Sequence, residues 1–248
     1  MTVGIDREKA GINEMTSNSA MSKPVIGILG AGKLGTVLAA RGTAAGYRIL
    51  IAGSGAPETI RAHLTATVPG VDVDTKETVT QRSDVVILAI PIGALDNIPF
   101  EALRGKVVID AMNHWLEADG PREDLNDPTT STSEIVQARL PDSHVVKAFN
   151  HMGYHDVDEL WAEPGDPQRN AIAIAGDDEA AVGVVDRIVD DFGFDPLHIG
   201  PLSEGVKLEP NTVAFGFTGS ADGLLRTIDM FSSTPRGRAV LTARGGRL

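Results

Sequence analysis

Three glycines at the G-x-G-x-x-G spacing, Gly30, Gly32 and Gly35, carry the clearest chemical signal in this chain. They follow the short apolar run 25–29 and lead into the alanine-rich segment 34–45, which has the composition of a helix. A strand, a glycine turn and a helix form the context in which this spacing binds a dinucleotide. The first glycine makes the turn, the second lets the pyrophosphate approach the backbone, and the third lets the helix pack on the strand. The alternative is a glycine turn that serves packing alone.

The residues after the second predicted strand, 47–52, indicate which dinucleotide would bind. NAD-binding units place an acidic residue on the ribose hydroxyls about 20 residues past the fingerprint. This chain has no acid between Gly35 and Glu58, so nothing there would repel a 2′-phosphate. Ser54 can donate a hydrogen bond to such a phosphate, and Lys33 and Arg61 are the nearby cations. These residues favour NADP over NAD. The alternatives are that Ser54 is a turn residue and that Arg61 is a solvated helix charge.

The order of the remaining elements predicts the fold class. Apolar strands are expected at 84–90, 106–111, 144–149, 171–175 and 194–199, and helices at 131–140 and 178–190. Alternating strands and helices predict an α/β fold of the Rossmann type with a doubly wound, mostly parallel sheet. The segment 116–130 reads as a polar loop, and 213–228 as a glycine-interrupted helix or a glycine-rich wall of the cofactor site.

Ligands of such sheets bind beyond the carboxyl ends of the strands. We therefore expect Asn113-His114, Asn150-His151 and Gly200-Pro201 to share one edge with the glycine turn. Asn and His side chains there can bind amides, riboses or rings, or can satisfy local backbone instead. The candidate cofactor-binding residues are Gly30, Ala31, Gly32, Lys33, Leu34, Gly35, Ser54, Arg61, Ile90, Pro91, Asn113 and Asn150.

Composition narrows the class of protein further. The chain has 248 residues, 42% hydrophobic residues, a formal net charge of −12 and no cysteine. The negative charge argues against nucleic-acid and acidic-membrane partners. The missing cysteines exclude disulfides and thiolate metal sites, and the histidines show no metal-ligand spacing. Since no apolar run is long enough to span a membrane, we expect a cytoplasmic protein with a small-molecule partner and no metal.

Four segments are expected along the chain. Residues 1–23 are polar and aperiodic, which predicts a disordered extension. An NADP-binding Rossmann domain is expected at 24–155. A C-terminal α/β part of the same compact unit is expected at 156–232. The basic, glycine-rich tail 233–248 is expected to be either disordered or an arm that binds a partner.

Seven sequence stretches between Val25 and about Phe215 resemble the coenzyme F420-dependent NADP oxidoreductases. They read VIGILGAGKLG, ILIAGSG, DVVILAIP, KVVIDAMN, VVKAFN, AIAGDDEAA and DPLHIGPLSEG. The resemblance implies a Rossmann-type fold whose C-terminal part completes the cleft, and hydride transfer between NADP(H) and the deazaflavin ring of F420. It also implies a homodimer. The stretches IDAMNHWLEADG and KAFNHMGYHD depart from the family pattern, and they leave the second substrate open.

Direct hydride transfer needs two aligned rings and a dry site rather than a nucleophile. If a proton is also needed, His114, His151 and Lys147 are the candidate donors, although Lys147 lies inside a predicted strand and can be a structural cation. The acidic tail of F420 would need positive charge, for which Lys207, Arg226 and Lys147 are the candidates. Two alternatives remain: an NADPH-dependent reductase of a small carbonyl, imine or metal chelate, and a nucleotide-sensing protein without turnover.

Overall fold

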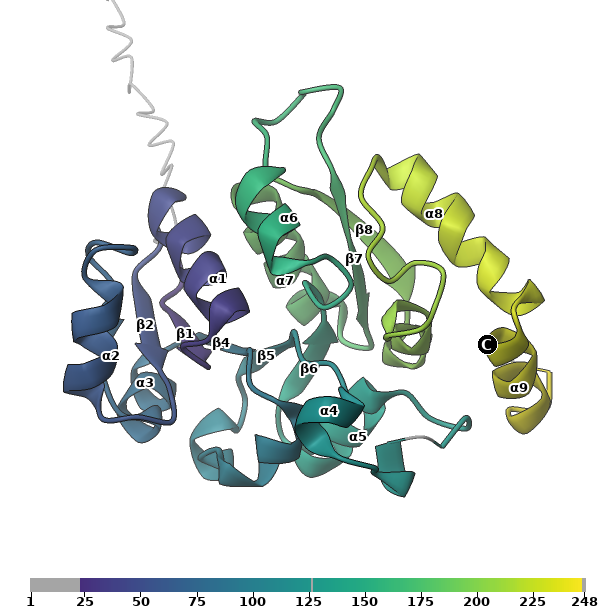
Figure 1. Ribbon diagram of the computed structural model, residues 1–248, viewed down its shortest axis with the longest axis horizontal. Helices are drawn as coiled ribbons and strands as arrows, with labels where there is room; N and C mark the ends of the chain where they lie inside the picture. Colours follow the sequence, from purple (N-terminus) through teal and green to yellow (C-terminus); the bar gives the residue numbers. More distant parts are fainter. Residues whose placement is uncertain (1–22, 126, 247–248) are drawn as a thin grey trace, which may run out of the picture.

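One twisted sheet organises the molecule, which is seen here in a computed structural model that describes residues 23–125 and 127–246 (Figure 1). Within those residues the sheet has eight strands in the order β3-β2-β1-β4-β5-β6-β7-β8. Strands β1 to β6 are parallel to one another, β7 is antiparallel to β6, and β8 is parallel to β7. The predicted doubly wound, mostly parallel α/β sheet is confirmed.

The strands are β1 (Ile26–Leu29), β2 (Ile49–Ala52), β3 (Asp72–Val73), β4 (Val85–Leu88), β5 (Val107–Asp110), β6 (His144–Lys147), β7 (Ala171–Gly176) and β8 (Asp195–Gly200). The α-helices are α1 (Lys33–Ala44), α2 (Pro57–Leu64), α3 (Lys76–Arg82), α4 (Leu116–Asp119), α5 (Thr132–Arg139), α6 (Tyr154–Glu159), α7 (Glu179–Asp191), α8 (Ala221–Asp229) and α9 (Pro235–Ala243). The 3₁₀ helices are η1 (Ile92–Asn97), η2 (Phe100–Leu103), η3 (Glu123–Leu125), η4 (Leu202–Leu208) and η5 (Met230–Ser233).

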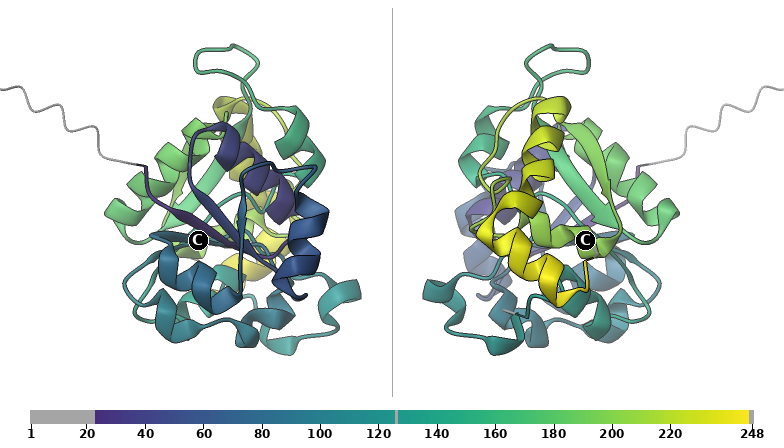
Figure 2. Two further views of the ribbon diagram at one scale, coloured as in Figure 1. Left: turned by 90° about the vertical axis from the view of Figure 1, so that its left-hand side faces the viewer. Right: turned by 90° about the vertical axis from the view of Figure 1, so that its right-hand side faces the viewer.

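The sheet is buried on both faces, which explains why its central strands are continuous apolar runs. Successive side chains of a strand point to opposite faces, so Ile87 joins one core cluster and Leu88 another. The first cluster contains residues of α1 and α7, and the second contains residues of α3, α5, η1 and η2. Figure 2 shows helices on both sides of the strands.

Local sequence signals place most of these elements. Ser131 and Glu134 form a capping box at the start of α5, and the Asp178 side chain caps α7 by accepting from Ala181 N–H at 2.8 Å. The segment 116–130, expected to be a loop, contains α4 and η3. The Asp119 carboxylate at the end of α4 accepts hydrogen bonds from the N–H groups of Gly93 and Trp115, which holds this short helix in place.

The reversal of β7 moves one predicted site segment to the other end of the sheet. Parallel pairing requires a long crossover that returns the chain to its starting edge. The connection from β6 to β7 contains the short helix α6 and does not return the chain to that edge, since β7 pairs antiparallel with β6. Strand β8 follows β7, so Gly200-Pro201 lies at the edge opposite the glycine turn. The expectation that Gly200-Pro201 would share the ligand edge is therefore wrong.

The basic tail is ordered as far as the structure describes it. Helix α9 packs through Val240 against Val206 and Phe231. Arg236 forms an ion pair with Glu209 and donates to the carbonyl of Pro210. The expectation of a disordered tail is wrong for residues 233–246, because buried apolar and charged contacts hold it on the body of the chain. The predicted extension 1–23 lies outside the described residues, except for Lys23.

None of the helices in 23–125 and 127–246 combines the length and the apolar character that crossing a membrane would take.

Candidate functional site

The glycine turn shows a different physical constraint at each of its three glycines. Gly30 has a φ of 124°, and a Cβ there would lie 2.2 Å from the carbonyl oxygen of Ala89. A Cβ on Gly35 would lie 1.8 Å from the carbonyl oxygen of Gly30. A Cβ on Gly32 would meet no atom within 4 Å. Gly30 and Gly35 are therefore required by the turn and its packing, whereas Gly32 borders open space that a pyrophosphate could occupy.

A pocket of about 360 Å³ opens beside this turn, at the carboxyl ends of β1, β2 and β4. Six of the predicted cofactor-binding residues line it: Gly30, Ala31, Gly32, Ser54, Ile90 and Pro91. The lining also contains Gly53, Gly55, Ile60, Lys76, Ala89 and Ala94. The other predicted cofactor-binding residues, Lys33, Leu34, Gly35, Arg61, Asn113 and Asn150, are outside this lining.

Two cations predicted to sit near the 2′-phosphate point elsewhere. Arg61 donates from Nη2 to the carbonyl of Val73 at 2.6 Å, so its guanidinium is engaged at β3. The Lys33 ammonium lies 5.1 Å from the centre of the Tyr154 ring, beside a second, more open hollow. Lys76, which sequence reasoning missed, lines the pocket itself. No short-range pattern could have found Lys76, because the pairing of β2 with β3 is what brings it to the pocket that Ser54 lines.

Asn113 and Asn150 bind each other rather than the pocket. The Asn113 side chain donates to the Asn150 carbonyl at 2.8 Å, and the Asn150 side chain donates to Asn113 Oδ1 at 3.1 Å and to the Leu208 carbonyl at 2.7 Å. The residue before Asn150, Phe149, is fully buried with a φ of 64°. A non-glycine residue in this region is strained and persists only where packing enforces it. The paired asparagines thus tie together the carboxyl ends of β5 and β6.

The three candidate proton donors all have structural partners. His151 is fully buried, its Nε2 accepts from Ala173 N–H at 3.0 Å, and burial lowers its pKa to about 4. His151 is therefore neutral at physiological pH. The Nε2 atom of His114 lies 3.0 Å from the carbonyl oxygen of Gly120. Lys147 is buried 3.2 Å from Asp110, which places it in its alternative role as a structural cation.

The Asp110–Lys147 pair positions the segment that follows β5. Lys147 donates to the carbonyl of Met112 at 2.8 Å, and Asp110 accepts from the N–H of Met112 at 2.9 Å. Ser133 donates to Asp110 at 2.6 Å. Both ends of the Met112 backbone unit are therefore held by buried charges, which fixes the start of the 113–115 loop.

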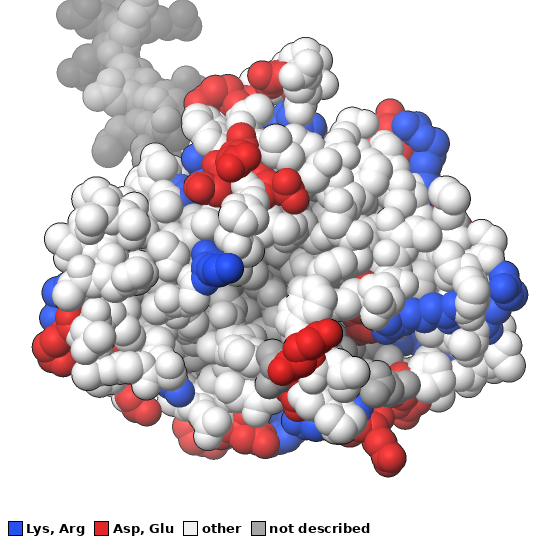
Figure 3. All heavy atoms as spheres, in the orientation of Figure 1, with Lys and Arg blue, Asp and Glu red and all other residues white. Residues whose placement is uncertain are grey.

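Aromatic side chains from distant segments meet at this same edge. Trp115 is 44% exposed, and its ring lies 5.5 Å from that of Phe215 in an edge-to-face arrangement. The N–H of Gly216 donates to the His151 carbonyl at 2.7 Å. The segment 213–219 thus meets the ends of β5 and β6. Figure 3 shows a hollow in the middle of this face, with acidic side chains over α4 and over α6 on either side.

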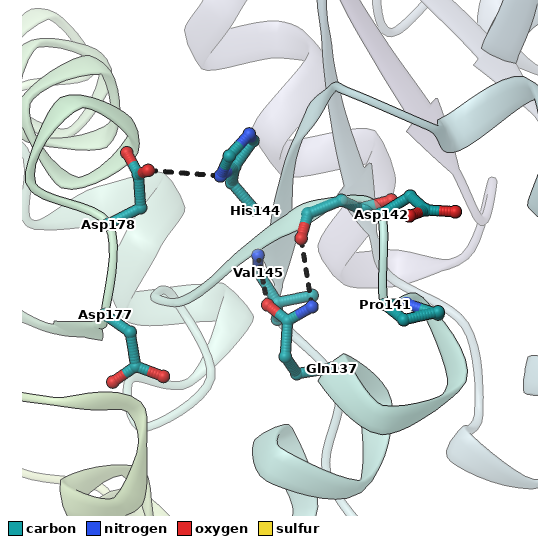
Figure 4. A pocket seen from close by; sticks show the side chains of 8 residues that line it. Gln137, Pro141, Asp142, His144, Val145, Asp177 and Asp178 are labelled. Atoms are coloured by element: carbon teal, nitrogen blue, oxygen red, sulfur yellow. Dashed lines mark hydrogen bonds and ion pairs between the residues drawn. The ribbon is translucent and has the colours of Figure 1, made fainter.

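A separate hollow lies at the opposite edge of the sheet (Figure 4), where β6 begins and β7 ends. His144 Nδ1 lies 3.2 Å from Asp178, and Gln137 bridges Ser143 and Val145 by hydrogen bonds. Asp177 accepts from the N–H of Leu202 at 2.9 Å. These side chains serve local structure. Within the described residues, no group of three or more His, Cys, Asp or Glu is arranged to hold a metal ion.

The part of the chain that contains the glycine turn is similar to known proteins. Residues 25–114 match the family model described as NADP oxidoreductase coenzyme F420-dependent. The protein YjhV of Escherichia coli K12 is 35% identical over 85 residues, which cover 34% of this chain and 61% of that protein. The metalloreductase STEAP3 of Rattus norvegicus is 26% identical over 191 residues, which cover 75% of this chain and 36% of STEAP3. The matches thus span less than two thirds of the length of either relative.

Solved structures agree on the fold. A hypothetical protein, SMa0349 of Sinorhizobium meliloti, superposes with a TM-score of 0.69 at 27% identity, covering 78% of this chain and 94% of that one. A structure named "putative f420 dependent nadp-reductase", from Arthrobacter sp. FB24, superposes with a TM-score of 0.64 at 21% identity. The superposition covers 85% of this chain and 94% of that one. The predicted resemblance is confirmed for residues 25–114, which match the model of the coenzyme F420-dependent NADP oxidoreductase family.

Proposed function

We propose that the chain binds NADP(H) in the pocket beside Gly32 and transfers a hydride between it and a flat redox substrate, a deazaflavin of the F420 type being the first candidate. The observation that carries the proposal is the open space beside Gly32, in a pocket lined by Ser54 and Lys76 and by no carboxylate. A dinucleotide phosphate needs close backbone approach and positive charge, and this pocket offers both.

The residues around the pocket would bind and orient rather than react. NADPH, when bound, supplies the hydride. The backbone at Gly30 and Gly32 would accommodate the pyrophosphate, and Ile90 and Pro91 would form an apolar wall that excludes water. Trp115, which is exposed, and Phe215, which packs against it, offer aromatic surface on which a flat ring could pack. The candidate proton donors are buried or bonded to backbone, so a reaction without a proton donor suits the site best.

A second candidate function follows from the charges around the hollow. The anionic tail of F420 would need cations, but Lys147 is buried against Asp110, and Lys207 is paired with Glu204 at 2.5 Å. Of the three candidate cations, only Arg226 is exposed without a carboxylate partner among the described residues. Acidic side chains lie over α4 and α6 (Figure 3), and two of the three candidate cations are neutralised. This charge distribution favours a neutral or cationic substrate over an anionic one. The second candidate is therefore an NADPH-dependent reductase of a small carbonyl, imine or metal chelate.

The relatives agree with both candidates. The matched family is named for F420, and STEAP3 is named as a metalloreductase. A sensor that binds the nucleotide without turnover is the remaining possibility, because the glycine turn reports binding alone.

The test is NADPH oxidation by the purified full chain, followed by absorbance with F420, FMN, a ferric chelate, and carbonyl and imine panels. Each reaction is run at low and high salt, since screening weakens the attraction of a charged substrate. We expect turnover with F420. Turnover with another substrate alone selects the second candidate, and NADPH binding without turnover selects the sensor. Failure to bind NADPH contradicts all three functions.

A further inference from the structure

Lys76 lies where two neighbouring strands of the sheet end. It is the first residue of α3, shortly after β3, and β3 pairs in parallel with β2 through Ile51 and Val73. Because parallel strands carry their carboxyl ends to one edge, this pairing brings Lys76 to the turn that follows β2. Lys76, Ser54 and Gly55 all line the same pocket.

The ammonium of Lys76 has no acidic partner in the part of the chain that the structure describes. Its hydrogen bond goes to the carbonyl of Asn97 at 3.3 Å, which is a long contact. Three other lysines are paired with carboxylates: Lys23 with Asp191, Lys147 with Asp110, and Lys207 with Glu204. An unneutralised lysine at a pocket is notable in a chain with a net charge of −12.

Lys76 is also the sole charged residue among the described residues that line this pocket. The remaining lining consists of glycines, alanines, isoleucines, a proline and Ser54. The other cations considered for this role are engaged elsewhere, Arg61 at the Val73 carbonyl and Lys33 beside the Tyr154 ring. An anion near Ser54 would therefore meet one hydroxyl donor, one ammonium and no carboxylate.

We propose that Lys76 and Ser54 form the subsite for the 2′-phosphate of NADP(H), and that Lys76 is the residue that selects NADPH over NADH. The inference rests on the proposed nucleotide binding and adds to it the group that is recognised and the residue that recognises it. Lysine binds phosphate as a flexible point charge, so a long contact to a carbonyl is easily exchanged for a phosphate oxygen. NADH has no 2′-phosphate and gains nothing from this lysine.

The test measures equilibrium binding of NADPH, NADH, 2′,5′-ADP and 5′-AMP to the full-length chain by titration calorimetry. The variants are Lys76→Met, which keeps an apolar stem, Lys76→Arg, which keeps the charge, and Arg82→Ala. Arg82 is an exposed cation at the far end of the same helix and lies outside the pocket lining, so it controls for the loss of one charge. Thermal unfolding of each variant shows whether the loss of the Asn97 contact affects the fold.

We expect Lys76→Met to weaken NADPH and 2′,5′-ADP about tenfold or more, as for a charge-assisted hydrogen bond, and to leave NADH and 5′-AMP within about twofold. Lys76→Arg should restore most of the NADPH affinity, and Arg82→Ala should change neither ligand. If wild type prefers NADPH and Lys76→Met does not reduce that preference, the subsite is wrong while the proposed function stands. If wild type binds neither dinucleotide, the proposed function itself is overturned.

Discussion

At the scale of single residues, the glycine turn separates packing from binding. Gly32 borders open space, so an Ala there meets no atom of the protein, whereas Gly35 touches the Gly30 carbonyl. We expect Gly32→Ala to keep the thermal stability of wild type and to lose NADPH affinity, because the new methyl group occupies the approach of the pyrophosphate. Gly35→Ala should lower stability instead. NADPH titration and thermal unfolding check both variants, and unchanged NADPH affinity in Gly32→Ala would remove the glycine turn from the binding site.

The position of Ser54 in the pocket predicts how an added negative charge there would affect the binding of each dinucleotide. Replacing Ser54 with Asp puts a carboxylate into the pocket lining, where it would face a 2′-phosphate. We expect Ser54→Asp to weaken NADPH about tenfold or more and to affect NADH much less, since repulsion between like charges acts only on the phosphate. Ser54→Ala is the matched control, and it should lose only the hydroxyl contact. Equal weakening of both dinucleotides by Ser54→Asp would argue against the NADP preference.

The buried histidine predicts a dependence of stability on pH. His151 has its pKa lowered by burial to about 4, against 6.5 for an exposed histidine. Above pH 6.5 the ring is neutral in both the folded and the unfolded chain. As the pH falls from 6.5 toward 4, the unfolded chain gains a proton that the folded chain does not bind, so the free energy of unfolding decreases, by up to about 3 kcal/mol.

Urea unfolding at pH 7, 6 and 5 measures this effect. His151→Gln is the comparison, because a Gln can still accept a hydrogen bond from the Ala173 N–H but does not titrate. We expect wild type to lose more stability than His151→Gln over this range, whatever the starting stability of the variant. Parallel losses in the two proteins would show that the pKa of His151 is the same in the folded and the unfolded chain, against its burial in the core.

At the scale of elements, the ends of β5 and β6 are joined by the buried Asp110–Lys147 pair. Lys147→Met leaves the Asp110 carboxylate buried with only Ser133 and the Met112 N–H as partners. Removing one member of a buried pair costs roughly 3 to 5 kcal/mol, because the remaining charge is uncompensated. We expect Lys147→Met to lose stability of that order and the double variant Asp110→Asn/Lys147→Met to recover part of it. A single variant as stable as wild type would show that the pair contributes nothing to the fold.

The local elements also show where sequence reasoning succeeds. The capping box at Ser131 and the Asp178 cap involve residues three positions apart, so the printed sequence contains both partners of each contact. The direction of β7 was not available in this way. It depends on the pairing of β7 with β6, which is a property of the folded sheet.

At the scale of the whole molecule, the oligomeric state is a proposal that rests on the family resemblance. We propose a homodimer and expect multi-angle light scattering to give twice the chain mass of 26.1 kDa at micromolar concentration. The measurement is repeated with NADPH, because a ligand that binds one state better shifts the equilibrium toward it. A single monomeric species under both conditions would contradict the proposal.

The sequence by itself determined the α/β class, the glycine turn and most of the strands, because each depends on residues that are close in the chain. The G-x-G-x-x-G spacing spans six positions, and apolar β-branched runs identify buried strands wherever they pair. Six of the candidate cofactor-binding residues line one pocket for this reason. The edge at which they meet follows from the shared direction of parallel strands.

Only the tertiary structure decided which charges face that pocket and which are neutralised. Lys33 and Arg61 are cations near the nucleotide-binding segments in sequence, but their side chains contact Tyr154 and Val73. Lys147 carries the charge of a catalytic or binding lysine, yet Asp110, on the neighbouring strand, neutralises it. Lys76 reaches the pocket because β3 pairs with β2. Electrostatic environment depends on distances in space, which residue types and spacing along a chain do not contain.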